Sequence, residues 1–429
     1  MTQGPVQNVQ VDLAVAGCGL AGVASAYFAA QEGLSVVLCG STGGLVFTSG
    51  YFDVLGYAER GNTTPLSDPW AGVEELSARE PAHPYARCTP TEIRSAMREF
   101  LQFTAEAGLP YADAGDSNFQ ACTMSGLPKT TWAVPQTMRA GVDMLQSSLP
   151  CLVVSFAGLK GFSARQFAAV LSSRRPNIRA VSCDFPGMEG RSEVYAEHMA
   201  RAMEVPGACE KLAERLRPHL ADAKFVGMPA MLGIHDCDAV CHNMAELLGC
   251  PVFEIPSMPP SVPGIRLREA YELALSARGV MLLPRHKVLQ ARQGGNGWTL
   301  DCGARELECR VEAKNLLLAT GRFLGGGLQA RRTGIRESIL DLPVHQPEGR
   351  SMWHRLEYFD LRGHELNRAG VQVDDACRPV GVDGQPVYPN LYAAGSILGY
   401  QDWIRSRCGT GLAVATAQRA VAALREQAV

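Results

Sequence analysis

The stretch that decides the fold is residues 12–40, DLAVAGCGLAGVASAYFAAQEGLSVVLCG. It opens with a short apolar run of strand length, 12–16, and closes with a second apolar run, 34–39. Between them lie a glycine-rich turn and an alanine-rich segment, 23–32, which has the length of a helix and ends at Gly33. Strand, turn, helix and strand of these lengths predict a βαβ unit in a parallel sheet.

The turn carries glycines at the spacing Gly-x-Gly-x-x-Gly. In this context the first glycine permits the tight turn, the second lets a phosphate approach the backbone, and the third lets helix and strand pack closely. The first helical turn adds free N–H groups and a partial positive charge. A turn without a ligand is the alternative, but the βαβ context favours a phosphate-bearing cofactor. The predicted cofactor-binding residues here are Gly17, Gly19, Leu20, Ala21 and Gly22.

One part of the dinucleotide pattern is absent from the sequence. Dinucleotide-binding proteins usually place an Asp or Glu about 20 residues after the glycines, where it holds the adenosine ribose. Here no acidic residue occurs between Glu32 and Asp53. FMN has no adenosine half and needs no such residue. The sequence therefore favours FMN as the cofactor, with FAD as the alternative.

Two later segments, 316–321 and 390–395, resemble the glycine-terminated strands of two-domain flavoproteins. After the second, Ser396 stands where an Asp usually hydrogen-bonds the flavin ribityl chain, and a hydroxyl can also do so. An alanine-rich helix then begins within 408–413, and its N-terminus would stabilise an anionic reduced flavin. These segments add further predicted cofactor-binding residues: Thr320, Gly321, Gly395, Ser396, Gly409, Thr410, Gly411 and Leu412.

Composition excludes several classes of protein. The 429 residues include 40 Lys and Arg against 43 Asp and Glu, a net charge of −3, so neither a nucleic-acid surface nor a polybasic membrane patch is expected. Segment 13–30 has no charged residue, but glycines interrupt it, and we interpret it as buried strand and helix rather than a membrane span. No signal peptide is expected, because 1–11 contain no Lys or Arg.

Cysteine spacing bears on metal binding. The 14 cysteines include no Cys-x-x-Cys pair, so no iron–sulfur cluster is expected in this chain. The closest pair, Cys237 and Cys241, is followed by His242, an irregular arrangement for a metal site. We expect reduced, mostly buried thiols and no bound metal.

The order of the segments predicts the domain organisation. The glycine turns at the two ends of the chain belong to one domain, so a second domain must interrupt it. Four prolines within 256–263 mark the second boundary. The predicted fold is α/β: a Rossmann-like flavin domain with a parallel sheet, 8–60 and 264–429, interrupted by an α/β substrate or partner domain, 61–263.

Several further motifs make the chain resemble the B subunits of anaerobic glycerol-3-phosphate dehydrogenases over nearly its full length. These motifs are Ser49–Leu55, Pro81–Tyr85, Pro259–Leu267, Gly325–Leu328 with Gly334–Glu337, and Ala394–Gly399.

The resemblance implies a flavoprotein oxidoreductase of glycerol metabolism and anaerobic respiration, with FMN usually assigned to this subunit. It implies that Ser49 and Gly50 contact the flavin. It also implies a heteromeric complex, with an FAD-containing A subunit and an iron–sulfur C subunit that links the pair to the membrane and quinone. The chain would then be cytoplasmic and peripheral at the inner face of the cell membrane. The implied reaction is oxidation of sn-glycerol 3-phosphate to dihydroxyacetone phosphate.

Three side chains are candidates for catalysis. His83 could take the hydroxyl proton as hydride leaves to the flavin. Arg266 and Arg336 could each clamp the substrate phosphate. The alternatives are a structural histidine for His83 and structural ion pairs for both arginines.

Three functions remain open at this level. The chain could be the catalytic flavin subunit of the dehydrogenase. It could be a non-catalytic flavoprotein scaffold or electron relay for the A subunit. It could also be a stand-alone FAD-dependent oxidoreductase that acts on another hydroxy acid.

Overall fold

The computed structural model describes residues 6–428, apart from 42 and 296. The chain forms two compact units, each with its own parallel-stranded sheet. The first unit comprises Met1–Gly44, Asp53–Phe100 and Tyr271–Val429, and the second comprises Leu45–Phe52 and Leu101–Ala270. The predicted α/β class, with a second α/β part interrupting the first, is confirmed.

The unit boundaries differ from those expected at 60/61 and 263/264. Residues 61–100 belong to the first unit, where the Phe100 ring packs 5.6 Å from that of Tyr271, centroid to centroid. The division between the units falls within two helices, α3 (Pro90–Glu106) and α9 (Val262–Ala277). Hydrophobic periodicity identifies such helices without showing which core each one joins.

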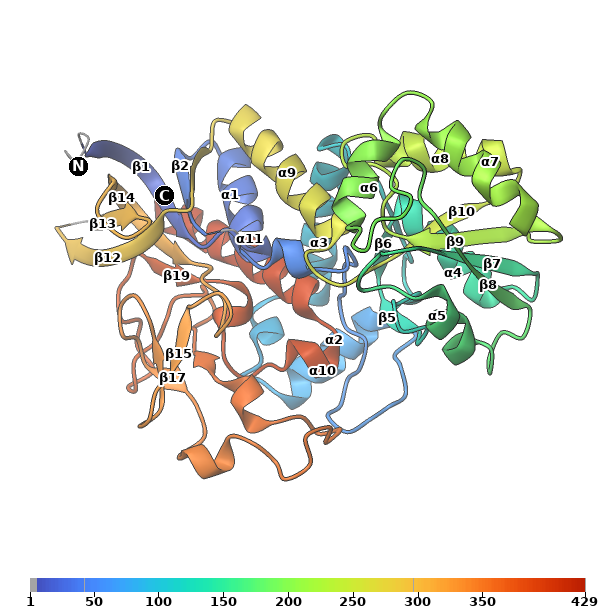
Figure 1. The fold of residues 1–429 in the computed structure, drawn as a ribbon. Coiled ribbons are helices and arrows are strands. Elements are labelled where there is room, and N and C mark those ends of the chain that lie inside the picture. Colours follow the sequence, from blue (N-terminus) through green and yellow to red (C-terminus); the bar gives the residue numbers. More distant parts are fainter. Residues whose placement is uncertain (1–5, 42, 296, 429) are drawn as a thin grey trace. The chain divides into compact units, whose positions relative to one another are not determined.

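In the described part of the first unit, seven strands form one sheet in the order β11-β2-β1-β14-β13-β12, with β19 beside β14 (Figure 1). All neighbours are parallel except the β12-β13 and β13-β14 pairs. The apolar runs of β1 and β2 are buried on both faces, as parallel strands covered by helices require. The strands are β1 (Gln7–Ala16), β2 (Val36–Gly40), β11 (Met281–Pro284), β12 (Lys287–Gly294), β13 (Gly297–Gly303), β14 (Cys309–Leu318) and β19 (Leu391–Ala393).

Two alanine-rich helices lie side by side in this unit, α1 (Leu20–Gln31) and α11 (Gly409–Ala428) (Figure 1). Small side chains allow the two helix backbones to approach closely, so the two ends of the chain meet in one core. The unit also contains α2 (Pro69–Arg79) and α10 (Trp403–Ser406), and two short strand pairs: β15 (Leu328–Ala330) with β16 (Ile335–Glu337), and β17 (Val344–His345) with β18 (Gly370–Val371).

The second unit has a four-stranded parallel sheet in the order β10-β9-β7-β8. Its strands are β7 (Cys151–Phe156), β8 (Ile178–Cys183), β9 (Phe225–Pro229) and β10 (Val252–Ile255). Its helices are α4 (Arg139–Gln146), α5 (Ala164–Leu171), α6 (Ala196–Met203), α7 (Ala208–Leu220) and α8 (Cys237–Leu248). Two strand pairs complete it: β3 (Tyr111–Asp113) with β6 (Ala133–Pro135), and β4 (Phe119–Ala121) with β5 (Lys129–Thr131). Across the described residues, no helix has the length and apolarity that a membrane crossing needs.

Candidate functional site

The first glycine turn packs directly against the end of β14. Gly17 has a φ of +122°, and a Cβ there would lie 2.2 Å from the carbonyl oxygen of Ala319. A Cβ on Gly22 would lie 1.7 Å from the carbonyl oxygen of Gly17. Packing within the protein therefore requires glycine at both positions: Gly17 for the tight turn, and Gly22 for the close approach of α1 to that turn.

Gly19 differs from these two glycines because the space beside it is open. Of the described atoms, the nearest to its Cβ position is the backbone nitrogen of Gly44, 4.0 Å away. Gly19 is the N-cap of α1; none of the described side chains caps this end, and the first turn has no acidic residue. The N–H groups of Leu20 and Ala21 have no partner four residues back, as in any first helical turn. This arrangement fits a bound phosphate.

The turns after β14 and β19 lie beside the first one. The Ala319 N–H donates to the carbonyl of Ala16 at 2.8 Å, and the Ala394 N–H donates to that of Leu318 at 3.0 Å. Gly321 has a φ of +70°, and its Cβ position is 3.7 Å from Oγ of Ser396. The ends of three strands, β1, β14 and β19, thus converge on one edge of the sheet, where open parallel sheets bind their ligands.

Two features of these turns fit a ligand that touches backbone and hydroxyl groups. Ser396 is only half-buried, so its hydroxyl can be reached from outside the protein. Oγ1 of Thr320 is buried without a hydrogen-bond partner among the described residues. Gly395, by contrast, serves packing: its N–H donates to Oγ1 of Thr416 at 2.9 Å, and a Cβ would lie 2.5 Å from that of Ala21.

The start of α11 is held by residues 53–54 and Tyr85. The N–H of Gly411 donates to the carbonyl of Asp53 at 2.7 Å, and a Cβ on Gly411 would lie 2.3 Å from the Tyr85 hydroxyl. That hydroxyl donates to the carbonyl of Val54 at 2.6 Å. Gly411 therefore positions the helix, and the Leu412 N–H is likewise engaged, with the carbonyl of Cys408. Direct cofactor contact by Gly409, Thr410, Gly411 and Leu412 stays a prediction.

His83 is buried next to Tyr85, which holds the start of α11. It is 3% exposed, and its Nδ1 accepts a hydrogen bond from the N–H of Tyr85 at 3.1 Å. Burial, assisted by the charge of Arg368, lowers the pKa of His83 to about 3. A neutral histidine with so low a pKa is a weak base, so these observations favour its structural reading over proton abstraction.

We expect His83 to make the protein less stable in acid. The folded-state pKa of about 3 lies below the ordinary value of 6.5, so its contribution is complete above pH 6.5 and is lost as the pH falls toward 3. His83→Asn keeps an acceptor for the Tyr85 N–H and removes the titration. Urea unfolding measured across this pH range should show a weaker pH dependence for the variant. Equal dependence in both proteins would contradict the prediction.

Arg266 lies in the second unit, in a buried ion pair with Glu254 of β10. Its two terminal nitrogens lie 2.6 and 2.8 Å from the two carboxylate oxygens, and its Nε donates to the carbonyl of Gly233 at 2.9 Å. The carboxylate also accepts from Thr137 Oγ1 and from the N–H groups of Met231 and Leu232, at 2.7–2.8 Å. Burial opposes ionisation of Glu254, but the Arg266 charge and these hydrogen bonds lower its pKa overall.

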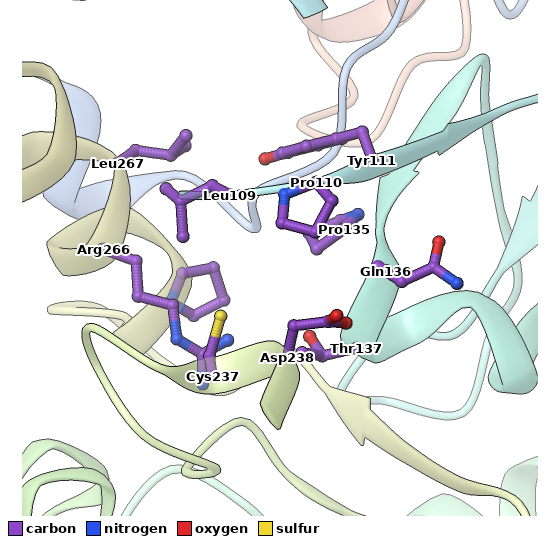
Figure 2. Close-up of a pocket in the computed structure, with 11 residues that line it drawn as sticks. Leu109, Pro110, Tyr111, Pro135, Gln136, Thr137, Cys237, Asp238, Arg266 and Leu267 are labelled. Atoms are coloured by element: carbon purple, nitrogen blue, oxygen red, sulfur yellow. The ribbon is translucent and has the colours of Figure 1, made fainter. Parts of the chain in front are cut away.

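The cavity beside Arg266 is small (Figure 2). It measures about 20 Å³ and is lined by apolar side chains together with Gln136, Thr137 and Asp238. This volume holds about one water molecule. Arg266 is 3% exposed and fully engaged by Glu254 and Gly233, so the geometry favours the structural ion pair over a substrate clamp.

Arg336, in the first unit, is also paired. Its guanidinium nitrogens lie 2.7 and 2.5 Å from the two carboxylate oxygens of Asp341, and both side chains are well exposed. Arg336 lines an open surface cavity of about 780 Å³, together with Arg292 and Arg331. An exposed pair of this kind contributes little to stability, and a substrate role for Arg336 stays a prediction.

Ser49 and Gly50 belong to the second unit, unlike the other predicted cofactor residues. Gly50 has a φ of +85°, its Cβ position is 2.8 Å from Cβ of Pro263, and its carbonyl accepts from the Tyr111 hydroxyl at 2.6 Å. This network explains the need for glycine within the second unit. Contact of Ser49 and Gly50 with the cofactor stays a prediction.

The cysteines are free thiols in the structure. Cys237 and Cys241 lie on α8, and burial raises the pKa of each thiol. His242 is exposed, with its Nε2 3.2 Å from the carboxylate of Glu246. Among the described residues, no group of three or more His, Cys, Asp or Glu side chains is arranged to hold a metal ion.

Sequence reasoning missed an acidic residue near the first turn. The end of β2 has no room for one, because a Cβ on Gly40 would lie 2.8 Å from the backbone nitrogen of Cys18. Glu272, on α9, is close enough to Cys18 for its charge to add to the effect of burial, which raises the pKa of that thiol to about 12. Cys18 and Glu272 are far apart in the sequence, so no local pattern indicates that they lie close together.

This fold and its converging glycine turns define a two-domain α/β flavoprotein. A family model described as an FAD binding domain matches residues 12–412. The chain is 31% identical to a Halobacterium salinarum protein named as the probable B subunit of an anaerobic glycerol-3-phosphate dehydrogenase, covering 97% of this chain and 98% of that one. It is 28% identical to the Vibrio vulnificus protein named as the B subunit of the same enzyme, covering 96% and 95%. The chain therefore belongs to the family of anaerobic glycerol-3-phosphate dehydrogenase B subunits.

Among solved structures, a 3-ketosteroid Δ1-dehydrogenase from Sterolibacterium denitrificans matches the chain with a TM-score of 0.45 and 13% identity. The match covers 97% of this chain and 100% of that chain.

The family membership bears on the cofactor. It supports flavin binding, and most directly FAD, because the matching model describes an FAD binding domain. The preference for FMN over FAD is not supported. That preference rested on the absence of an acid between Glu32 and Asp53, and an acid distant in sequence, such as Glu272, can approach the same turn.

Proposed function

We propose that this chain is the flavin-bearing B subunit of an anaerobic glycerol-3-phosphate dehydrogenase and that its flavin is FAD. The observation that carries this proposal is the convergence of the turns at Gly17–Gly22, Ala319–Gly321 and Gly395–Ser396 in one unit. The substrate comes from the names of the curated relatives.

The residues present fit such a cofactor. The N–H groups of Leu20 and Ala21 would hold the pyrophosphate, and the open space at Gly19 would admit it. The Ser396 hydroxyl would bind the ribityl chain, and the start of α11 would lie toward the ring. Glu272 would reach the adenosine ribose. When bound, a flavin supplies an acceptor for hydride that can pass electrons on singly.

Partner subunits complete the proposal. The relatives are named as subunits of a larger enzyme, which supports a heteromeric assembly. We propose an FAD-containing A subunit as the direct partner and an iron–sulfur C subunit that passes electrons to quinone. The chain would be cytoplasmic and would reach the inner face of the membrane through that partner.

An electron relay is a second candidate, favoured by a specific observation. All three catalytic candidates are already engaged: His83 is buried and neutral, Arg266 is bound to Glu254, and Arg336 is bound to Asp341. In a relay the A subunit would oxidise the substrate, and this chain would carry the electrons onward.

The test is release and reduction of the cofactor. Acid treatment of the purified chain followed by chromatography should yield FAD; FMN alone would contradict the FAD assignment, and a flavin-free chain would contradict the proposed function. Anaerobic glycerol 3-phosphate should then bleach the bound flavin. Bleaching by the substrate alone indicates catalysis on this chain, whereas bleaching only after addition of the A subunit indicates the relay.

A further inference from the structure

Segment 356–361 of the first unit exposes an unusual concentration of apolar side chains. Leu356 is 99% exposed, Tyr358 78%, Phe359 82% and Leu361 54%. The rings of Tyr358 and Phe359 lie against each other, with centroids 4.9 Å apart in an edge-to-face arrangement. We call these four side chains the 356–361 patch. Contiguous exposed apolar surface of this kind marks an interaction site.

Most of the charged side chains around the patch have partners within the chain; Arg350, for example, lies over the Trp353 ring, 5.0 Å from its centroid. Residues 350–365 contain three Arg and three acidic residues, so the segment has no net charge. Arg362 pairs with Asp360 at 2.6 Å, and Glu365 binds both Arg355 and Arg60 at 2.9 Å. A surface that binds anionic lipid needs free basic side chains beside its apolar ones. A protein interface instead has aromatic side chains at its centre and few free charges there.

The patch is anchored on elements that carry the proposed flavin site. Arg322, which follows Gly321, donates to the carbonyls of Leu366 and Ala369, each at 2.7 Å. Oδ2 of Asp402, the N-cap of α10, lies 2.6 Å from the Cβ position of Gly363.

The element α10 adds apolar surface close to this anchor. It presents the partly exposed side chains of Trp403 and Ile404, and it ends shortly before α11 begins. In Figure 1 the segment 356–361 falls in the orange part of the chain, and α10 is labelled. A protein bound here would therefore contact the chain close to the turn at Ala319–Gly321 and to the start of α11.

We propose that the 356–361 patch is the docking surface for the A subunit and that its ligand is an uncharged, apolar face of that subunit. The proposal rests on the proposed function for the identity of the partner. The internally paired charges favour an apolar protein face over a membrane, and the anchoring places the contact beside the site that exchanges electrons with the partner.

The test compares binding of the purified A subunit to three forms of the full-length chain. Tyr358→Ser/Phe359→Ser should weaken binding by about tenfold or more, because exposed aromatic side chains that become buried dominate interface energies. Val382→Ser is the matched control, since Val382 is 100% exposed in the same unit outside the patch, and it should bind as the wild type does. Flavin content and thermal midpoint should stay unchanged in all three.

A second variant guards against loss of folding. Leu356 is 99% exposed, so Leu356→Asp removes almost no buried contact and should also weaken binding. Wild-type affinity in both patch variants, or no binding of the wild-type chain to the A subunit, would overturn the proposal. The proposal would also be overturned if the patch variants still bound the A subunit but no longer self-associated, or no longer bound phosphatidylglycerol vesicles. If the chain lacks flavin but binds the A subunit through the patch, the proposed function is contradicted and the docking surface is not.

Discussion

Gly22→Ala is expected to weaken flavin binding severely. The added Cβ would lie 1.7 Å from the carbonyl oxygen of Gly17 and 3.3 Å from Cδ1 of Leu38, so α1 would have to move away from the turn. Overpacking of this kind costs about 1–3 kcal/mol or more and displaces the first-turn N–H groups. We expect flavin affinity to fall by at least about 100-fold, since each factor of ten corresponds to about 1.4 kcal/mol. The measurement is reconstitution of the apoprotein with FAD.

Two further alanine variants separate ligand contact from protein packing. Gly294, in the β12-β13 hairpin, has no described atom within 4 Å of its Cβ position, so Gly294→Ala should leave flavin binding unchanged. Gly19→Ala should preserve the thermal midpoint, because the described atom nearest to its Cβ would be 4.0 Å away, yet it should weaken flavin binding by crowding the phosphate. Wild-type flavin affinity in both Gly19→Ala and Gly22→Ala would contradict the site.

The parts of the fold that the sequence predicted are those with local patterns. The apolar runs and glycines of 12–40 predict strand, turn and helix, because each depends on residues close in the chain. Gly321 and Gly395 predict the other two turns in the same way, and the order of the segments places them in one domain. The structure brings these turns together, as the positions of Ala319 against Gly17 and of Gly395 against Ala21 show.

The parts that could not be predicted depend on contacts between distant residues. Glu254 stands in an apolar strand with no local sign that its partner is Arg266. The N–H of Gly411 donates to the carbonyl of Asp53, more than 350 residues earlier in the chain, and no local pattern in the sequence indicates this contact. The preference for FMN over FAD is not supported for a related reason, because a missing local acid does not show whether another helix supplies one.

Glu254→Leu is expected to destabilise the second unit by about 3–5 kcal/mol. The variant leaves the Arg266 charge buried, with its Nε still donating to the carbonyl of Gly233, and it removes the acceptor for the N–H groups of Met231 and Leu232. Leaving a buried charge without its counterion costs far more free energy than the intact ion pair contributes to stability. Urea unfolding at neutral pH, followed by far-UV circular dichroism, gives the difference in unfolding free energy.

A double-mutant cycle makes this prediction specific to the ion pair. Arg266→Met alone leaves a buried carboxylate, which still accepts from Thr137 Oγ1 and two backbone N–H groups and can become protonated, so a smaller loss is expected. Glu254→Leu/Arg266→Met removes both charges and should recover much of the stability lost in Glu254→Leu. If the two single losses simply add in the double variant, the charges are not coupled and this account of Arg266 is wrong. If Arg266 instead bound substrate, Arg266→Met would raise KM without this stability pattern.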